Sequence, residues 1–525
     1  MSVIFTSEHP HIGLIEAPVH QVVLRRAAEF GDRPALIDGL TGEVTTYRQL
    51  DQRSRRLAAA FAAAGVRKGD VVALHSPNSV LYPVVFYGVL RAGAVVTPVS
   101  AQATVPEMAG QLADSRCRWV VTVPAGLGVA QEAAKRAGGV EEIFLCGPEQ
   151  DGRPSILDMQ RSTAPEPFIV FDAREDLAVL PYSSGTTGAP KGVMLSHSNV
   201  ATNLIQIEAF LPSRVGEPLL AVLPFSHIYG LTVLLNTPLR MGATVVVLPR
   251  FDLAEFLTAI ERYRIASLYV APPIVLMLAK HPAVDGRDLS SLEFVLSAAA
   301  PLDAGLAEAC ARRLGLPSVV QGYGMTELSP GVSLCPRGGT DAPAGTVGRL
   351  LPGTELRLLD LAAPGRDAAA GAPGEIAIRG PQVMKGYLGR SGDTAAMIDE
   401  GGWLHTGDVG RMDGDGWLYI VDRVKELIKY KGYPVPPAEL EALLLAHEAI
   451  ADAAVVGVYD AEGNEVPRAV VVRRPGSELD EDEVMAYVAG LVAPYKRVRQ
   501  VRFVEAVPRS ASGKILRREL RDAGD

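Results

Sequence analysis

The stretch YSSGTTGAPKGVMLSH, residues 182–197, places small polar residues, glycines and a single lysine directly after the apolar run 177–180. Successive backbone N–H groups in a glycine-rich turn form a concavity that binds anions, and serine and threonine hydroxyls add donors. The common phosphate-loop pattern G-x-x-x-x-G-K-[ST] does not fit, because Lys191 follows Pro190 and precedes Gly192. We therefore expect an anion-binding loop of another kind, with a flexible surface loop as the competing interpretation.

Short apolar runs rich in β-branched residues alternate with helical patterns over most of the chain before residue 340. The predicted strands cover residues 71–76, 119–123, 219–225, 243–249, 267–272 and 294–300. Helical patterns lie between them, for example at 47–65 and 251–264, and Gly65 fits a C-terminal cap. This alternation predicts an α/β fold of mainly parallel sheets covered by helices. Ligands in such folds bind beyond the carboxyl ends of strands, where the loop after residue 182 lies.

The pattern changes after about residue 340. Connections rich in glycine, proline and alanine flank GEIAIRG and WLYIVD, which we interpret as strands of a small β-rich subdomain. A compact α+β pattern then follows, with helices at 437–447 and 481–492 and strands at 452–459, 467–473 and 501–505. We place a domain boundary at 422–425, which predicts a large domain over residues 1–424 and a hinged C-terminal domain over 425–525.

Composition excludes several classes of protein. The 525-residue chain carries a net charge of −9, which argues against a general affinity for nucleic acids or anionic membranes. Its cysteines, at 117, 146, 310 and 335, are too far apart in sequence for a C-x-x-C pair, so buried thiols are expected. The N-terminal stretch lacks a secretion-signal pattern, and Arg91 interrupts the apolar run 80–90. We expect a cytoplasmic protein.

The stretch YSSGTTGAPKG resembles the phosphate loop of the adenylate-forming superfamily, which includes acyl- and aryl-CoA ligases, beetle luciferases and peptide-synthetase adenylation domains. Further stretches match in the family's order: QGYGMTE (321–327), GWLHTGD (402–408), VDRVKELIKYKG (421–432) and PRSASGKILRREL (508–520). PFSHIYGL, VAPPIVL, YLGR and YKGYPVPPAELEALL are most similar to the 4-coumarate–CoA ligases. The resemblance covers nearly the whole chain and implies ATP, Mg²⁺ and coenzyme A as cofactor and co-substrates.

The resemblance also implies which residues bind ATP and AMP. Asp408 and Arg423 would hold the ribose, and Glu327 would bind Mg²⁺, a cation that prefers carboxylate oxygen. Tyr323 would stack on adenine, Gly322 and Gly324 would let the backbone come close to a flat group, and Thr326 would contact an α-phosphate oxygen. Without the motifs, Asp408 would be interpreted as a turn or cap residue, and QGYGMTE as a turn entering a helix. The full nucleotide set is Ser183, Ser184, Gly185, Thr186, Thr187, Gly188, Lys191, Gln321, Gly322, Tyr323, Thr326, Asp408, Arg423, Lys425, Lys429 and Lys514.

Several lysines take roles that their positions alone would not suggest, because lysines in tails and charged helix ends are usually solvated. By resemblance, Lys514 bridges the acid carboxylate and the α-phosphate, and Lys425 is the hinge. The implied catalytic residues are Lys514, Lys429, Thr326 and His227, and the implied CoA-binding residues are Arg250, Lys431 and Gly432. Plant ligases usually carry glutamine where this chain has Pro434, so a polar contact of the thioester step is missing.

The implied acid pocket has apolar walls with few polar groups, which suits an apolar carboxylic acid. Small residues at 298 and 299 leave room for a planar ring, and Val233 stands where plant enzymes often carry serine. The predicted lining is His227, Tyr229, Val233, Ala298, Ala299, Gly322, Gly324, Pro330, Val332 and Leu334.

The sequence therefore predicts a ligase that activates an aromatic, hydroxycinnamate-like acid as acyl-AMP and transfers it to CoA. Alternatives remain open: a fatty-acyl–CoA ligase with a longer pocket, or a stand-alone adenylation enzyme that loads a carrier protein. A non-catalytic nucleotide-binding protein is disfavoured because Lys514, Asp408 and Glu327 are all present.

Overall fold

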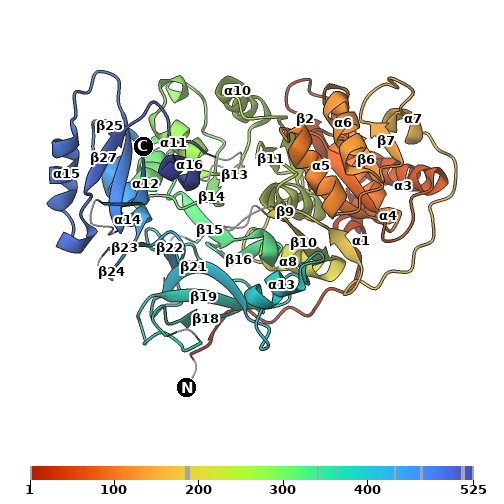
Figure 1. Cartoon of the computed structure of the whole chain (residues 1–525). Helices are drawn as coiled ribbons and strands as arrows, with labels where there is room; N and C mark the ends of the chain where they lie inside the picture. The colour runs from red at the N-terminus through yellow and green to blue at the C-terminus, as the bar shows by residue number, and fades with distance from the viewer. Residues whose placement is uncertain are drawn as a thin grey trace.

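The computed structural model describes residues 3–183, 190–339, 342–363, 365–430, 433–460, 465–509 and 515–522. It confirms the predicted α/β architecture, with two large sheets, a smaller antiparallel sheet and a C-terminal α+β part (Figure 1). The C-terminal elements, blue in Figure 1, lie at one side of the molecule and the helices of the first sheet at the other.

The first sheet has eight strands, and five neighbouring strands that reach one edge of it run parallel. These are β8 (Leu177–Val179), β5 (Val95–Val99), β4 (Val71–His75), β6 (Trp119–Thr122) and β7 (Glu142–Leu145). Successive residues of β4 face opposite helical layers, because side chains alternate along a strand: Val72 and Leu74 join one apolar cluster and Ala73 another. The covering helices are α3 (Tyr47–Ala64), α4 (Tyr82–Arg91), α5 (Val105–Asp114) and α6 (Leu127–Ala137).

Helix α3 shows how local sequence sets an element's bounds. It starts at a capping box, in which the Thr46 side chain accepts from the Gln49 N–H and the Gln49 side chain accepts from the Thr46 N–H. It ends at Gly65, whose φ of 107° favours glycine. The cap expected at Gly65 is therefore confirmed.

The second sheet has nine strands and carries the candidate site at one edge. Its parallel strands are β2 (Pro34–Asp38), β12 (Thr244–Val247), β11 (Pro218–Ala221), β13 (Ser267–Val270), β14 (Phe294–Ser297) and β15 (Val320–Gly324). Antiparallel strands complete it: β3 (Val44–Thr46), β16 (Gly331–Leu334) and β17 (Arg349–Leu350). The helices associated with it include α8 (His197–Glu208), α9 (Thr237–Met241), α10 (Leu253–Tyr263), α11 (Pro272–Lys280) and α12 (Ala304–Leu314).

Several predicted strands end earlier than the apolar pattern suggested, and two of them show why. The strand expected at 219–225 stops at Ala221, and the Phe225 N–H instead donates to the side chain of Asn78 at 2.7 Å. The strand expected at 267–272 stops at Val270, because Pro272 begins helix α11, where its fixed φ is already helical. Apolar character alone does not mark the end of a strand.

The β-rich subdomain that the sequence predicted is present, and the structure shows it as a five-stranded antiparallel sheet. Its strands are β1 (Phe5–Thr6), β18 (Glu355–Leu359), β19 (Gly374–Arg379), β21 (Leu404–Met412) and β22 (Leu418–Arg423). β1 brings the N-terminal segment to an edge of this sheet, beside β18.

The C-terminal part has its own apolar core. Its strands are β23 (Ile428–Tyr430), β24 (Tyr433–Val435), β25 (Ile450–Tyr459), β26 (Glu465–Arg473) and β27 (Gln500–Phe503), and its helices are α14 (Pro437–Ala446), α15 (Glu481–Ala489) and α16 (Arg517–Asp522). The predicted helix at 481–492 ends sooner, with Gly490 as its C-terminal cap.

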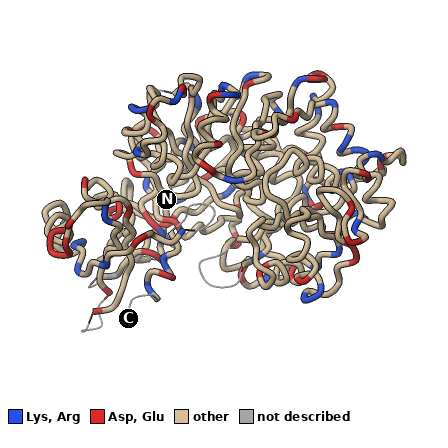
Figure 2. Tube along the Cα trace, turned by 90° about the horizontal axis from the view of Figure 1, so that it is seen from above, with Lys and Arg blue, Asp and Glu red and all other residues tan. Residues whose placement is uncertain are grey.

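The charged residues are distributed as expected for a chain with a net charge of only −9. Figure 2 shows basic and acidic residues interspersed along the trace. All four cysteines are buried and none forms a disulfide, which confirms the expected buried thiols. Among the helices of the described residues, none combines the length and apolar character needed to span a bilayer.

We predict that Gly348, which precedes β17, tolerates no side chain. Its φ is +98°, and an added Cβ would lie 2.0 Å from the carbonyl carbon of Leu334, a backbone atom that cannot rotate away. Gly348→Ala should therefore lower the melting temperature sharply or prevent folding. Gly315→Ala is the matched control, because Gly315 also has a positive φ of +69° but no atom within 4 Å of the added Cβ. The control should cost only about 1–2 kcal/mol, and equal losses for the two variants in a thermal melt would contradict the clash.

Candidate active site

The glycine-rich loop connects two antiparallel strands. β9 (Tyr182–Ser183) pairs with the start of β10 (Lys191–Ser196), so that Lys191 lies opposite Ser183 and Gly192 opposite Tyr182. The predicted loop residues Ser184, Gly185, Thr186, Thr187 and Gly188 lie outside the described residues. The two ends of the loop are nevertheless placed, and they carry the Ser183 hydroxyl and the Lys191 ammonium.

Glu327 connects the loop to the QGYGMTE segment. It lies in the short 3-10 helix η4 (Thr326–Leu328), is 4% exposed, and its Oε1 accepts from the Ser183 hydroxyl at 2.8 Å and the Tyr387 hydroxyl at 2.9 Å. Burial, reinforced by the Glu327 carboxylate, raises the pKa of Tyr387, so its hydroxyl remains a donor. Thr326, the predicted contact of the α-phosphate, is half-buried beside this carboxylate.

Lys191 is paired with an acidic residue. Its Nζ lies 3.1 Å from the Asp393 carboxylate and 5.0 Å from the centroid of the Tyr387 ring. Neither Tyr387 nor Asp393 was among the predicted site residues. Tyr387 belongs to the YLGR stretch (387–390), which carries part of the family resemblance, whereas Asp393 lies outside every motif quoted for it.

Asp408 and Arg423 are brought together by the antiparallel pairing of β21 and β22. The Arg423 Nε lies 3.0 Å from one carboxylate oxygen of Asp408, and the Tyr323 hydroxyl donates to the other at 2.6 Å. Asp408 is 5% exposed. Burial and the nearby Asp408 carboxylate raise the pKa of Tyr323 well above its usual value. The three residues predicted to contact ribose and adenine therefore form one hydrogen-bonded group.

The glycines of QGYGMTE are required by packing against the next strand. An added Cβ at Gly322 would lie 2.4 Å from a Leu334 methyl group, and one at Gly324 would lie 2.1 Å from the Pro330 carbonyl oxygen. The sequence interpretation attributed both glycines to close approach of a flat ligand. In the structure they allow β16 to lie against β15, and this pairing places Pro330, Val332 and Leu334 beside the motif. The Gln321 side chain accepts from the Leu302 N–H at 3.1 Å and fixes the preceding segment.

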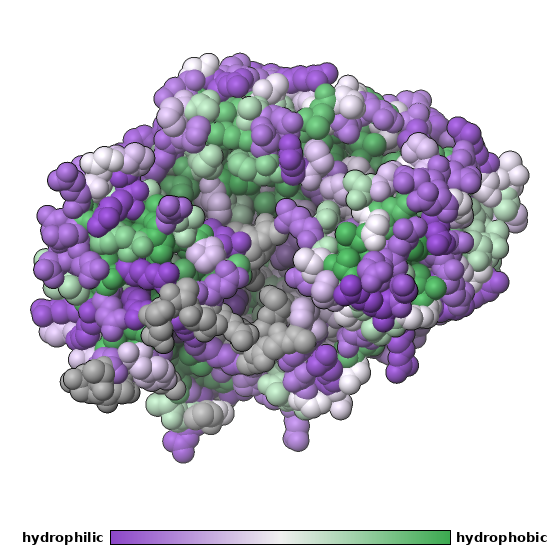
Figure 3. Space-filling model, turned by 45° about the horizontal axis from the view of Figure 1, so that its top comes forward, coloured by the Kyte–Doolittle hydropathy of each residue, from purple (hydrophilic) through white to green (hydrophobic). Residues whose placement is uncertain are grey.

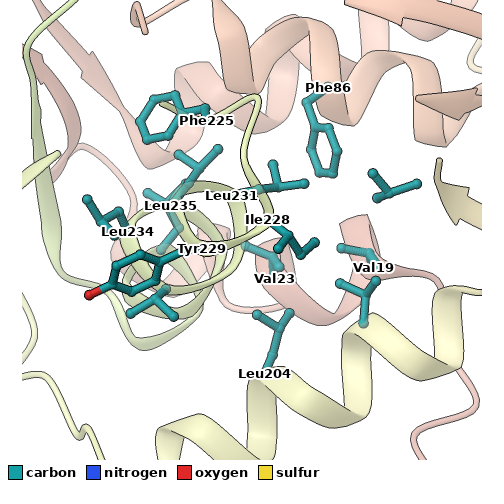
Figure 4. Close-up of a cluster of buried hydrophobic side chains, with 14 of the residues drawn as sticks. Val19, Val23, Phe86, Leu204, Phe225, Ile228, Tyr229, Leu231, Leu234 and Leu235 are labelled. Carbon is teal, nitrogen blue, oxygen red and sulfur yellow. The ribbon is translucent and has the colours of Figure 1, made fainter. Parts of the chain in front are cut away.

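Part of the predicted acid pocket comes from η2 (Gly230–Asn236) and the residues just before it. η2 is a π-helix, a form that often occurs at functional sites. It contains Val233, and His227 and Tyr229 precede it. Tyr229 and Val233 are almost fully buried, and Figure 4 shows the Tyr229 ring among aliphatic side chains with its hydroxyl pointing away from them. That hydroxyl lies 3.5 Å from the Val270 carbonyl oxygen, and burial raises the pKa of Tyr229. The His227 Nδ1 accepts from the Tyr229 N–H at 3.2 Å, which leaves the proton of a neutral ring on Nε2.

Ala298 and Ala299 follow the carboxyl end of β14 and are partly buried against the main apolar core. Ala299 has a φ of 73°, a backbone conformation that is uncommon for residues other than glycine. The π-helix is joined to the β16 side by the Thr232 hydroxyl, which donates to the Ser329 carbonyl at 3.2 Å. The predicted pocket residues thus come from η2, the end of β14, and the paired strands β15 and β16.

The C-terminal site residues are only partly described. Lys425 follows β22, and the backbone of Lys429 belongs to β23, although its side chain lies outside the described part of the chain. Lys431, Gly432 and Lys514 also lie outside it. Arg250 is exposed between β12 and α10.

Glu327 offers the carboxylate that would bind a magnesium ion. Across the described residues no group of three or more acidic, histidine or cysteine side chains could hold a metal on its own. Proteins usually bind Mg²⁺ through one or two carboxylates together with substrate phosphates and water. A single buried carboxylate close to the loop fits that arrangement.

Figure 3 shows that the molecular surface is hollowed between the C-terminal part and the rest of the chain.

Comparison with known proteins agrees with these observations. The AMP-binding enzyme family model matches residues 23–388, and the AMP-binding enzyme C-terminal domain matches residues 439–514. A relative named 4-coumarate–CoA ligase 5, from Oryza sativa subsp. japonica, is 42% identical over 99% of this chain and 97% of its own length.

Solved structures share the fold. The anthranilate CoA ligase AuaEII in complex with anthranoyl-AMP has a TM-score of 0.89 at 26% identity, covering 98% of each chain. ATP-bound MatB from Rhodopseudomonas palustris has a TM-score of 0.87 at 31% identity, covering 97% of this chain and 99% of MatB, whereas apo MatB gives 0.78. The chain therefore belongs to the AMP-binding enzyme family, as an ATP-dependent, AMP-forming acid–thiol ligase.

Proposed function

We propose that the acid activated by this enzyme is aromatic and hydroxycinnamate-like, and that the acceptor is coenzyme A. The acid carboxylate and ATP would give acyl-AMP and pyrophosphate, and the CoA thiol would then displace AMP. The observation that carries the proposal is an apolar wall with small residues. Ala298 and Ala299 follow β14, which pairs with the strand that bears Tyr323, and they pack against the same apolar cluster that contains Tyr229 and Val233. The 4-coumarate–CoA ligase relatives support the same substrate class.

In this proposal the described residues bind the nucleotide at its ribose and at its polyphosphate. The Asp408 carboxylate, oriented by Arg423, accepts hydrogen bonds from the two ribose hydroxyls. Ser183 and Lys191, at the two ends of the loop, contact the polyphosphate. Glu327 would hold Mg²⁺, which neutralises phosphate charge when it is bound.

Lys514 supplies the positive charge next to the reacting carboxylate and α-phosphate. A fixed charge placed where charge develops in the transition state is commonly worth about 3 kcal/mol, on the order of a hundredfold in rate. We further propose that the boundary lies at 422–425 and that the C-terminal domain rotates about Lys425 between the two half-reactions. The higher TM-score to ATP-bound than to apo MatB supports a domain arrangement suited to the adenylation step.

The substrate class is tested with a panel of acids. Cinnamic, coumaric, benzoic and octanoic acids are each supplied with ATP and CoA, and AMP formation is measured. We expect the highest kcat/KM with a cinnamic acid, because the pocket wall is apolar and small at residues 298 and 299. A preference for octanoate would instead identify a fatty-acyl–CoA ligase, and acyl-AMP formation without transfer to CoA would indicate a carrier-protein acceptor.

The proposed role of Lys514 in adenylation predicts a loss of activity in the first half-reaction when this lysine is replaced. Lys514→Ala should reduce acid-dependent pyrophosphate release by on the order of a hundredfold or more, because the charge is absent from the transition state. Arg521→Ala is the control, since Arg521 is an exposed cation on helix α16 of the same tail. Unchanged release in the Lys514 variant would refute the assignment.

Asp422, at the proposed boundary, should make stability depend on pH. Burial raises the pKa of Asp422 to about 7, although the Arg423 and Ala438 backbone N–H groups favour the charged form. The folded protein therefore binds a proton that the unfolded chain releases above about pH 4, so stability falls as pH rises from about 4 to 7.

Asp422→Asn removes this titration. The melting temperature of the variant relative to the parent should rise between pH 5 and pH 8. The exposed Asp415→Asn should show no such trend. A constant difference between the Asp422 variant and the parent across this range would contradict the prediction.

A further inference from the structure

Helix α13 (Ser391–Met397) brings an acidic residue to the end of the anion-binding loop. It follows β20 (Gly386–Tyr387), which pairs antiparallel with β10, so that Tyr387 lies opposite Val193. This pairing places the start of α13 beside the first residue of β10. As a result, the Asp393 carboxylate lies 3.1 Å from the Lys191 Nζ.

The Lys191 ammonium is largely withdrawn from water. Its side chain is 15% exposed and that of Asp393 is 40% exposed, and the ammonium also lies 5.0 Å from the centre of the Tyr387 ring. Within the described part of the chain, Asp393 is the carboxylate that forms an ion pair with Lys191. The other nearby carboxylate, Glu327, is hydrogen-bonded to the Tyr387 hydroxyl. The charge of Lys191 is therefore already neutralised before any phosphate arrives.

The position of α13 does not depend on this ion pair. Arg390 lies 3.5 Å from Asp114, which also accepts from the Tyr182 hydroxyl at 2.7 Å. The Tyr387 N–H donates to the Thr394 hydroxyl at 2.9 Å. These contacts hold the segment on both sides of Asp393. The charge of Asp393 can therefore be removed while the neighbouring residues stay in place.

We propose that Asp393 is an exchange counterion for Lys191: it competes with the polyphosphate of ATP, and with pyrophosphate, for the ammonium. This inference rests on the proposed function, in which Lys191 contacts the polyphosphate. Without a counterion, departure of pyrophosphate would leave the ammonium of Lys191 unpaired and largely withdrawn from water, which is unfavourable. Re-forming the ion pair with Asp393 removes that cost and favours release of the first product. Asp393 is thus a positioning residue that acts through Lys191.

The test measures equilibrium affinities for ATP, pyrophosphate and AMP by calorimetry, with Mg²⁺ present and no acid substrate. Asp393→Asn keeps the shape of the side chain and removes its charge. We expect ATP and pyrophosphate to bind about two- to fivefold more tightly, the range for a partly exposed ion pair. AMP affinity should not change, because AMP lacks the β- and γ-phosphates. Asp393→Glu, which keeps the charge, should behave like the parent enzyme.

A double-mutant cycle separates the counterion role from a structural one. In the Lys191→Ala background, adding Asp393→Asn should have no effect on pyrophosphate affinity. Asp114→Asn is the matched control, because it removes a carboxylate that holds the same segment without touching Lys191; it should not tighten pyrophosphate binding selectively.

Three results would overturn the counterion role: unchanged or weaker pyrophosphate binding in Asp393→Asn, an equal change for AMP, or tightening that persists without Lys191. If Lys191→Ala alone left the affinities for ATP and pyrophosphate unchanged, Lys191 would not contact the polyphosphate. That result would refute this part of the proposed function, and the counterion role of Asp393 would be refuted as a consequence. The two failures are therefore distinguishable.

Discussion

The buried carboxylate of Glu327 is the constraint on which the arrangement of the site depends. A carboxylate that is withdrawn from water is costly unless donors surround it. Here the donors are hydroxyls from two distant segments, Ser183 at 144 residues' separation and Tyr387 at 60. The Met384 N–H also donates to the Glu327 carbonyl at 2.9 Å. The end of the anion-binding loop, the QGYGMTE segment and the start of the β20–α13 region must therefore meet at one point.

A second buried carboxylate joins the β-rich subdomain to this point. Asp408 accepts from Tyr323, on the strand just before Glu327, and from Arg423, on the last strand before the C-terminal part. Because the Asp408 carboxylate uses both of its oxygens, the position of β22 is fixed relative to β15. The chain that leads into the C-terminal part thus starts from a defined position beside the residues predicted to bind the nucleotide.

The pocket walls depend on backbone features more than on polar contacts. The π-helix η2 carries Val233 and follows Tyr229 directly, and the glycines at 322 and 324 allow β16 to approach β15. These features form an apolar, closely packed wall beside the polar group of Asp408, Arg423 and Tyr323. In the proposed function, this division suits an acid whose body is apolar and whose carboxylate must reach a phosphate.

The sequence by itself determined the fold class and the main strands and helices. It also singled out Asp408, Arg423 and Tyr323, which the structure joins in one hydrogen-bonded group, and their roles toward the nucleotide stay predictions. The strand expected at 71–76 is Val71–His75, and the helix expected at 47–65 is Tyr47–Ala64, because periodicity and caps are local signals. Only the tertiary structure decided that Tyr387 reaches Glu327 and that Asp393 neutralises Lys191. Both contacts follow from the pairing of β10 with β20, strands almost two hundred residues apart, and no local pattern specifies such a register. The packing role of Gly322 and Gly324 could not be predicted for the same reason: their neighbours belong to β16, whose position is set by packing.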